Sequence, residues 1–179
     1  MQALLRISRV IDATNRLVGR TTYWLILVMV LISAGNAMVR YGLNTSSNAW
    51  LEVQWYLFSA VFMLCAGYTL LNNEHIRIDI VNSHLAKRTR DWIDVVGHVV
   101  FLIPLCVLSL YEGWPYFWMA FTTGEISGNA GGLIRWPVKL MIVLGFALLL
   151  LQGISELIKR VAIIRGAMDD PNLAKPGAH

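Results

Sequence analysis

Charged residues are scarce in this sequence of 179 residues, where Lys, Arg, Asp and Glu make up 15% and hydrophobic residues 56%. Four long stretches contain none of them, residues 21–39, 53–73, 95–111 and 140–155. Soluble helices rarely lack charge over such a length, whereas about 20 apolar residues cross a hydrocarbon core of roughly 30 Å. The sequence therefore predicts an all-α integral membrane protein, one domain over 1–179 with four transmembrane helices near 21–40, 53–73, 94–113 and 137–157.

Basic residues are nearly absent from two of the five segments outside these stretches. Twelve of the 15 Lys and Arg residues precede the first span, separate the second from the third, or follow the fourth. Because basic residues resist translocation, this bias predicts that both ends of the chain lie in the cytoplasm. A signal peptide cleaved near the small residues 33–37 is an alternative. We expect no cleavage, since the apolar run is longer than a usual signal core.

Ionisable side chains are absent from the middle of the predicted spans, and the nearest acids lie at the ends: Glu52, Glu74, Asp94, Glu112 and Glu156. A carrier that couples transport to ions by itself usually has such a group, or a broken helix, near the bilayer midplane. The residues needed for a catalytic site are scattered over both sides of the membrane. We therefore expect a helper or scaffold subunit, with no enzyme activity, no metal ion and no cofactor.

Cysteine and histidine are also few, with two and four residues. Cys65 and Cys106 fall inside predicted spans, where we expect packing and no disulfide. His75 and His98 lie near the same ends of neighbouring spans, so the alternative function is a four-helix b-type cytochrome that anchors a redox complex. That alternative is disfavoured, because haem ligands normally lie well inside a span and His75 stands beside charged residues.

Two segments on the predicted cytoplasmic side are amphipathic. Within 1–20, the arginines share one sector of a helical wheel and the apolar residues lie opposite, which predicts a helix on the membrane surface or packed on a partner protein. The second segment shows the same apolar spacing, at Ile78, Val81, Leu85 and Trp92. The tail, 166–179, is expected to be flexible. The anchors expected to contact the membrane surface, including anionic lipids, are Arg6, Arg9, Arg16, Arg20, Lys87, Arg88, Arg90 and Trp92.

The segment between the third and fourth spans is rich in aromatic residues, Trp114, Tyr116, Phe117, Trp118 and Phe121. These residues predict an aromatic belt at the membrane surface. A helical extension of the third span is the alternative, with Pro104 and Pro115 as sites of a kink. Glycines between 128 and 132 permit a tight return to the fourth span.

Sequence motifs at the ends of the second and fourth spans add a family resemblance. Residues 50–56, WLEVQWY, enter the second span and residues 73–79, NEHIRID, leave it; GEIS at 124–127, GGL at 131–133 and WP at 136–137 follow. In this order they resemble the small membrane (DctQ-type) subunit of tripartite ATP-independent periplasmic (TRAP) transporters, over about residues 40–159. Val53 and Gln54 after Glu52 look like the branch associated with 2-oxo acids, mannitol and chloroaromatic compounds.

The resemblance implies a small permease subunit in the bacterial inner membrane, within a sodium-coupled secondary transporter that imports an organic acid. Its expected partners are a large permease subunit, which moves substrate in an elevator fashion, and through it a periplasmic substrate-binding protein. The small subunit is expected to enlarge the fixed scaffold and to help dock the binding protein. Candidate partner-interface residues are Trp50, Glu52, Gln54, Glu74, His75, Arg77, Asp79, Glu125, Arg135 and Trp136. For residues 74–79 a local polar cluster is the favoured alternative to a partner contact.

Overall fold

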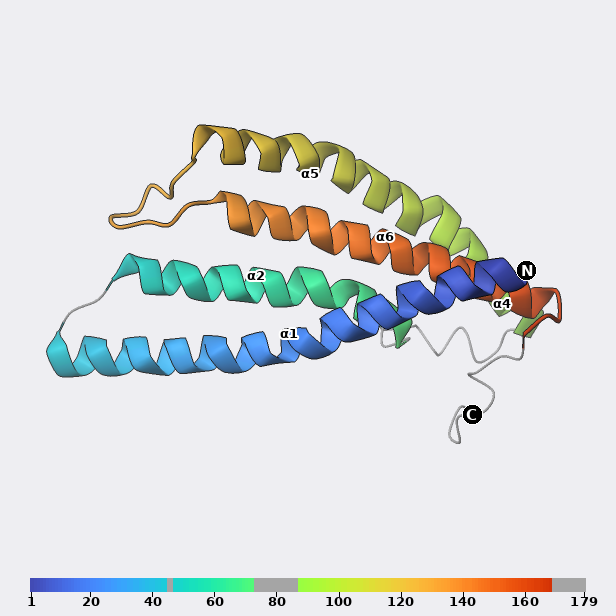
Figure 1. The fold of residues 1–179 in the computed structure, drawn as a ribbon, viewed down its shortest axis with the longest axis horizontal. Coiled ribbons are helices and arrows are strands. Elements are labelled where there is room, and N and C mark those ends of the chain that lie inside the picture. Colours follow the sequence, from blue (N-terminus) through green and yellow to red (C-terminus); the bar gives the residue numbers. More distant parts are fainter. Residues whose placement is uncertain (45–46, 73–86, 169–179) are drawn as a thin grey trace.

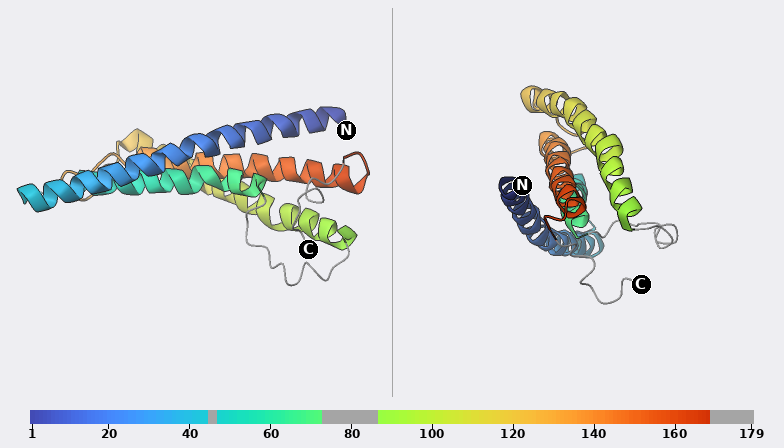
Figure 2. Two further views of the ribbon diagram at one scale, coloured as in Figure 1. Left: turned by 90° about the horizontal axis from the view of Figure 1, so that it is seen from below. Right: turned by 90° about the vertical axis from the view of Figure 1, so that its right-hand side faces the viewer.

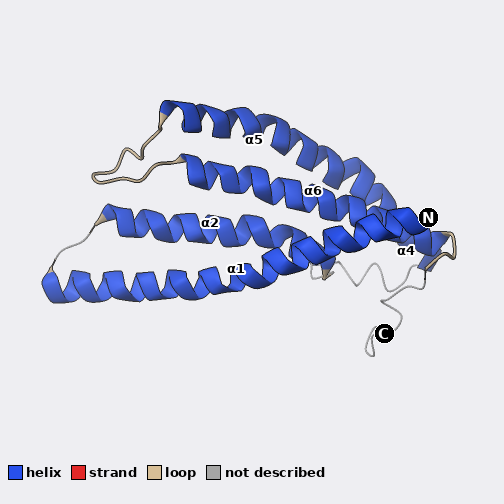
Figure 3. Cartoon of the chain, in the orientation of Figure 1, coloured by secondary structure: helices blue, strands red, loops and turns tan. Residues whose placement is uncertain are grey.

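The computed structural model describes residues 1–44, 47–72 and 87–168, and in this part of the chain the protein is helical (Figures 1 and 3). The helices are α1 (Gln2–Leu43), α2 (Asn48–Leu71), α4 (Lys87–Gly97), a π-helix (His98–Leu102), α5 (Ile103–Thr123) and α6 (Trp136–Ile164). Four helical segments are long and apolar enough to cross a membrane: α1, α2, residues 91–123 and α6. The all-α fold with four membrane-spanning helices is thereby confirmed.

The long helices lie side by side in the spatial order α1, α2, α6, α5 (Figure 1). Helix α6 contacts all three others, and α1 crosses over to reach it beyond the end of α2 (Figures 1 and 2). Residues 124–135 and the start of α2 lie at one end of the bundle, which we call the hairpin end. Helix α1 begins and α6 ends at the opposite, amino-terminal end. The centre of the fold is therefore α6.

Glycines allow these helices to approach closely. A Cβ atom added to Gly19 would lie 2.3 Å from Cγ of Tyr68, and one added to Gly145 would lie 2.8 Å from the backbone oxygen of Met63. Membrane helices associate through such close packing, because apolar side chains gain no hydrophobic energy by leaving lipid. The seams α1–α2 and α2–α6 thus depend on residues without side chains.

Helix α1 differs from the expected arrangement of a surface helix followed by a separate span, because it is one continuous helix from Gln2 to Leu43. Its early arginines are exposed, as are Ile7, Val10 and Leu17 on the apolar side. A third face, with Ser8 and Asn15, is the buried one and packs on α6. No break separates the predicted surface helix from the predicted span, and the hydrogen bonds of Ser8 and Asn15 hold the early part of α1 against α6.

The third span is also longer than expected. Helix α4, the π-helix and α5 follow one another without a break, so the described part of the second amphipathic segment, from Lys87, continues directly into the span. The N–H of Ile103 bonds to the carbonyl of His98, five residues back, just before Pro104. Proline has no N–H and crowds the preceding turn, which a wider π turn accommodates. Helix α5 then continues to Thr123, so the aromatic residues lie on the helical extension that was the alternative.

Candidate functional site

In the part of the chain that the structure describes, residues 124–135 between α5 and α6 form a short hairpin. Ile126 and Ile134 form an isolated antiparallel bridge. The N–H of Ser127 donates to the carbonyl of Leu133 at 2.9 Å, and the N–H of Arg135 donates to that of Glu125 at 2.9 Å. Gly124 and Gly131 have φ values of 61° and 70°, a region that side chains disfavour. The expected tight return is thereby present, and its conformation is fixed by backbone bonds.

The Glu52 carboxylate binds this hairpin from the second turn of α2. Its Oε1 accepts hydrogen bonds from the Ser127 hydroxyl and, at 2.7 Å, from the Asn129 amide; its Oε2 accepts one from the N–H of Leu133 at 2.7 Å. The Glu52 residue is only 4% exposed. A buried carboxylate is costly unless its oxygens are bonded, and hydrogen bonds to a charged group are stronger than those between neutral groups. Glu52 is therefore the centre around which the hairpin is organised.

Two further α2 side chains bind the hairpin from the same helix face. The Asn48 amide donates to the carbonyl of Ala130 at 3.3 Å, and the Tyr56 hydroxyl donates to that of Ile134 at 3.1 Å. Residues 48, 52 and 56 are each four apart, so they lie above one another on one side of α2. This stripe fixes the hairpin to α2, although neighbouring α5 and α6 supply its covalent ends.

Two basic side chains share one carboxylate at the base of the hairpin. The Lys139 ammonium is 2.5 Å from Oε2 of Glu125 and 3.8 Å from the centre of the Tyr116 ring. The Arg135 guanidinium is 3.3 Å from Oε1 of Glu125. The hydrogen bond from Lys139 holds the pKa of Glu125 below its usual range, against the effect of burial. Lys139 is only 4% exposed, so this pair satisfies a buried ammonium group.

Aromatic packing joins α5 to the start of α6 beneath the hairpin. The Trp136 ring lies 5.5 Å from the Phe121 ring and 6.5 Å from the Phe117 ring, both edge to face. Trp114 stacks on Trp118 along α5 with centroids 6.2 Å apart. Such pairs contribute about 0.5–1.5 kcal/mol beyond their burial. The aromatic-rich segment therefore supports the hairpin in addition to presenting rings outward.

The candidate partner-interface residues occupy different positions. Glu52, Glu125 and Trp136 meet at the hairpin and bond within the chain. Gln54 accepts a hydrogen bond from the Ser33 hydroxyl of α1 at 2.6 Å. Trp50 and Arg135 are exposed. The cluster of Glu74, His75, Arg77 and Asp79 lies outside the described residues, as do most of the tail, from residue 169, and the side chains of Lys87, Arg88 and Arg90. Partner contact by any of these residues remains a prediction.

A second polar site, at the amino-terminal end between α1 and α6, was not predicted. The Asp12 carboxylate accepts from Gln152 at 2.9 Å, from Ser155 at 2.7 Å and from Lys159 at 3.1 Å. Lys159 also pairs with Glu156 at 2.5 Å. We call these five residues the Asp12 network.

Neighbouring side chains extend the Asp12 network in both directions along α1. The hydroxyls of Ser8 and Ser155 are 2.7 Å apart, and the Asn15 amide donates to Oε1 of Gln152 at 2.9 Å. On the other side of α6, Arg160 lies 2.9 Å from Asp91 and 3.0 Å from Asp94, so α4 is held as well. Ser8, Asn15 and Thr22 recur every seventh residue, which is the sequence signal for this face.

The Asp12→Asn variant is expected to lower the thermal unfolding temperature of the purified chain by roughly 4–8 °C. Asn keeps the shape but removes the charge that Lys159 and two neutral donors bind, a loss of about 2 kcal/mol. Thermal unfolding in mild detergent, followed by circular dichroism, measures the change. Thr14→Val is the control, because Thr14 is exposed on the same helix and its hydroxyl donates to the carbonyl of Val10 one turn earlier. An unchanged unfolding temperature for Asp12→Asn would show that Glu156 alone satisfies Lys159.

The two histidines of the haem alternative are not brought together by any described contact. Nδ1 of His98 is 2.6 Å from the carbonyl of Asp94, one turn earlier on the same helix. His75 lies outside the described residues. Cys65 and Cys106 are free thiols, and Cys106 is fully buried. A packing role for the two thiols stays a prediction.

Comparison with known proteins identifies the family. Residues 14–162 match the family model described as tripartite ATP-independent periplasmic transporters, DctQ component. The matched region begins near the Asp12 network on α1, includes Glu52 and the hairpin, and ends in the last turn of α6. Searches of curated proteins and of solved structures give no match. DctQ proteins are inner-membrane components of transporters, without enzyme activity, that work with a large permease and a substrate-binding protein. The chain belongs to the DctQ family, the small permease component of TRAP transporters.

Proposed function

We propose that this DctQ subunit is a fixed scaffold in a sodium-coupled importer of an organic acid, and that its hairpin helps to dock the substrate-binding protein. The observation that supports this best is a pair of ionic contacts, one near each end of α6. Lys139 is bound at the hairpin end and Lys159 at the amino-terminal end, so α6 is fixed at both ends by ionic contacts. A scaffold that stays still while a partner moves needs such rigidity.

The proposed orientation places the amino-terminal end in the cytoplasm and the hairpin in the periplasm. Of the three basic residues near the hairpin end, Lys139 is buried and paired, which leaves Arg40 and Arg135 exposed. The arginines of early α1 are exposed at the opposite end. This contrast follows the positive-inside rule and puts the basic anchors beside anionic lipid headgroups of the inner leaflet.

The surface proposed to dock the binding protein is the tip and outer side of the hairpin. Ile126 is 61% and Ile134 50% exposed, although both belong to a segment fixed by Glu52. Exposed apolar side chains on a rigid segment bind at low entropic cost, because little order has to be gained. Glu125 and Trp136 then act as supports of this surface, and the exposed Arg135 guanidinium, which pairs with Glu125, lies at its edge.

The substrate and the coupling ion are further parts of the proposal. In this arrangement both bind to the large subunit, since the four spans of this chain have no ionisable side chain near their middle. An organic acid of the 2-oxo acid, mannitol or chloroaromatic branch is the class suggested by Val53 and Gln54. Gln54 faces Ser33 within the chain, so it contributes to the α1–α2 contact and not to a substrate site.

Uptake by membrane vesicles that contain both subunits tests the scaffold role. With binding protein and labelled organic acid added, uptake is expected to require an inward sodium gradient and to fall at least tenfold when this chain is omitted. The amount of large subunit in the vesicles is measured in parallel, so that lost expression is not mistaken for lost transport. Equal uptake with and without this chain, at equal amounts of large subunit, would contradict the proposal.

The Ile126→Glu/Ile134→Glu double variant tests docking. We expect at least a tenfold loss of uptake at limiting binding protein and partial recovery when binding protein is in excess, because only the encounter is weakened. The control is Thr123→Glu, which adds a charge next to the hairpin at an exposed position of α5. Normal uptake by the double variant, or a loss that excess binding protein does not relieve, would argue against docking at this surface.

A further inference from the structure

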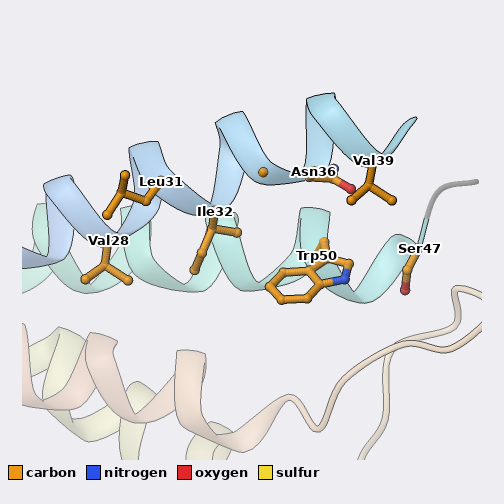
Figure 4. A pocket seen from close by; sticks show the side chains of 8 residues that line it. Val28, Leu31, Ile32, Asn36, Val39, Ser47 and Trp50 are labelled. Atoms are coloured by element: carbon orange, nitrogen blue, oxygen red, sulfur yellow. The ribbon is translucent and has the colours of Figure 1, made fainter. Parts of the chain in front are cut away.

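An open groove lies between α1 and α2 at the hairpin end, with a volume of about 620 Å³ (Figure 4). Val28, Leu31 and Ile32 line its inner part, while Asn36, Ser47 and Trp50 line the part nearest the connection between the helices. In Figure 4 the indole nitrogen of Trp50 lies on the side of the ring nearer Ser47. The groove is thus apolar at one end and has three hydrogen-bond donors at the other.

The chain leaves this groove unfilled because of a glycine. A Cβ atom built on Gly35, which lines the groove, would meet no atom within 4 Å. Leu31 remains 62% and Trp50 52% exposed. The volume lies within the range of about 300–1,000 Å³ that is usual for sites of small ligands.

The length of the groove corresponds to one leaflet of a bilayer. From Val28 to Val39 the helix rises roughly 16 Å, about half of a 30 Å hydrocarbon core. Closer to the amino-terminal end the seam is closed, because the Tyr68 ring fills the space over Gly19 and contacts Tyr23 edge to face at 6.2 Å. A helix from a partner protein would run the full height of the membrane, whereas a lipid acyl chain ends at the midplane.

We propose that this groove binds a phospholipid of the leaflet at the hairpin end, with one acyl chain along Val28 and Leu31 and the phosphate at the polar end. An acyl chain gains no hydrophobic energy by leaving other lipids, so selectivity comes from the polar end and from packing. The Asn36 amide, the Ser47 hydroxyl and the Trp50 N–H are donors, and a phosphodiester accepts. Arg40 follows Asn36 by one turn on the same face and supplies positive charge.

The bound lipid is tested on the full chain, purified in mild detergent together with its large subunit and incubated with palmitoyl-oleoyl phosphatidylglycerol. After extensive washing in mild detergent, native mass spectrometry counts the phospholipid retained per complex. The variant is Gly35→Leu, whose side chain occupies the groove. The matched control is Gly42→Leu, since Gly42 lies two turns later on α1, is equally open and is not part of the groove.

The unchanged complex is expected to retain one phospholipid, Gly35→Leu to retain at least fivefold less, and Gly42→Leu to be within 1.5-fold of the unchanged complex. Asn36→Leu, which removes a donor and leaves the apolar part intact, is expected to lower retention at least threefold and provides the answer if Gly35→Leu does not fold. The proposal is overturned if the unchanged complex retains no phospholipid, or if both groove variants retain as much phospholipid as the unchanged complex. Release of the large subunit by Gly35→Leu overturns it too, since a partner helix is then the occupant.

Discussion

The Gly67→Ala variant is expected to destabilise the helix bundle strongly, because the added methyl group strikes a buried side chain. Its Cβ would lie 2.3 Å from Oδ1 of Asn15 and 3.2 Å from the backbone oxygen of Leu148. The buried Asn15 amide, 1% exposed, must then move, and its hydrogen bond to Gln152 is lost. Overpacking and the lost bond together cost about 2–4 kcal/mol. We expect the unfolding temperature of the purified chain to fall by roughly 5–15 °C.

A control substitution and a double variant test whether the loss of stability comes from the contact with Asn15. Gly42→Ala, on the outer part of α1, would meet no atom within 4 Å and is expected to leave stability unchanged or slightly raised. In an Asn15→Ala background, Gly67→Ala should cost much less, because the side chain that it strikes has been removed. Additive effects of the two substitutions would contradict the described contact. They would place the cost of Gly67→Ala in the Leu148 backbone instead.

The same helix crossing shows what a sequence reveals of such a protein and what it does not. The four spans follow from charge-free runs, because the bilayer excludes charge over a known thickness. The partners of Asn15 do not follow, since Gly67 and Gln152 belong to other helices and only the crossing geometry brings them together. Asp12 was missed for a related reason, because the first 20 residues read as a surface helix whose polar side faces water. One of its polar faces instead bonds to α6.

At the hairpin end too, the sequence reveals the motifs but not the contacts between them. Glu52 and the GEIS and GGL motifs were singled out by family resemblance, as separate short runs. Their relation is physical, because the Glu52 carboxylate bonds to Ser127 of the first run and to Leu133 of the second. Tyr56, the last residue of the WLEVQWY run, and Asn48, which lies outside the quoted motifs, bind the hairpin from the same side of α2. For Asn48 the signal available was the periodicity of α2, with polar groups every fourth residue.

The Glu52→Gln variant is therefore expected to release the hairpin while leaving the bundle assembled. An amide has one acceptor oxygen, so either the N–H of Leu133 or the donors of Ser127 and Asn129 must face another N–H group. Limited trypsin digestion measures the release, because Arg135 is exposed and its N–H is bonded within the hairpin. Cleavage after Arg135 should accelerate at least tenfold, and uptake with the large subunit and binding protein should fall at least tenfold.

The control for this result is Glu112→Gln, which removes a carboxylate charge at an exposed position of α5 near the same end. It should leave both cleavage and uptake within twofold of the unchanged chain. If Glu52→Gln abolishes uptake while trypsin sensitivity stays normal, Glu52 acts by contact with a partner, as its place in the family motif first suggested. If both readouts stay normal, the bonds from Asn48 and Tyr56 suffice to hold the hairpin. The paired measurement thus separates a side chain that positions the docking surface from one that belongs to it.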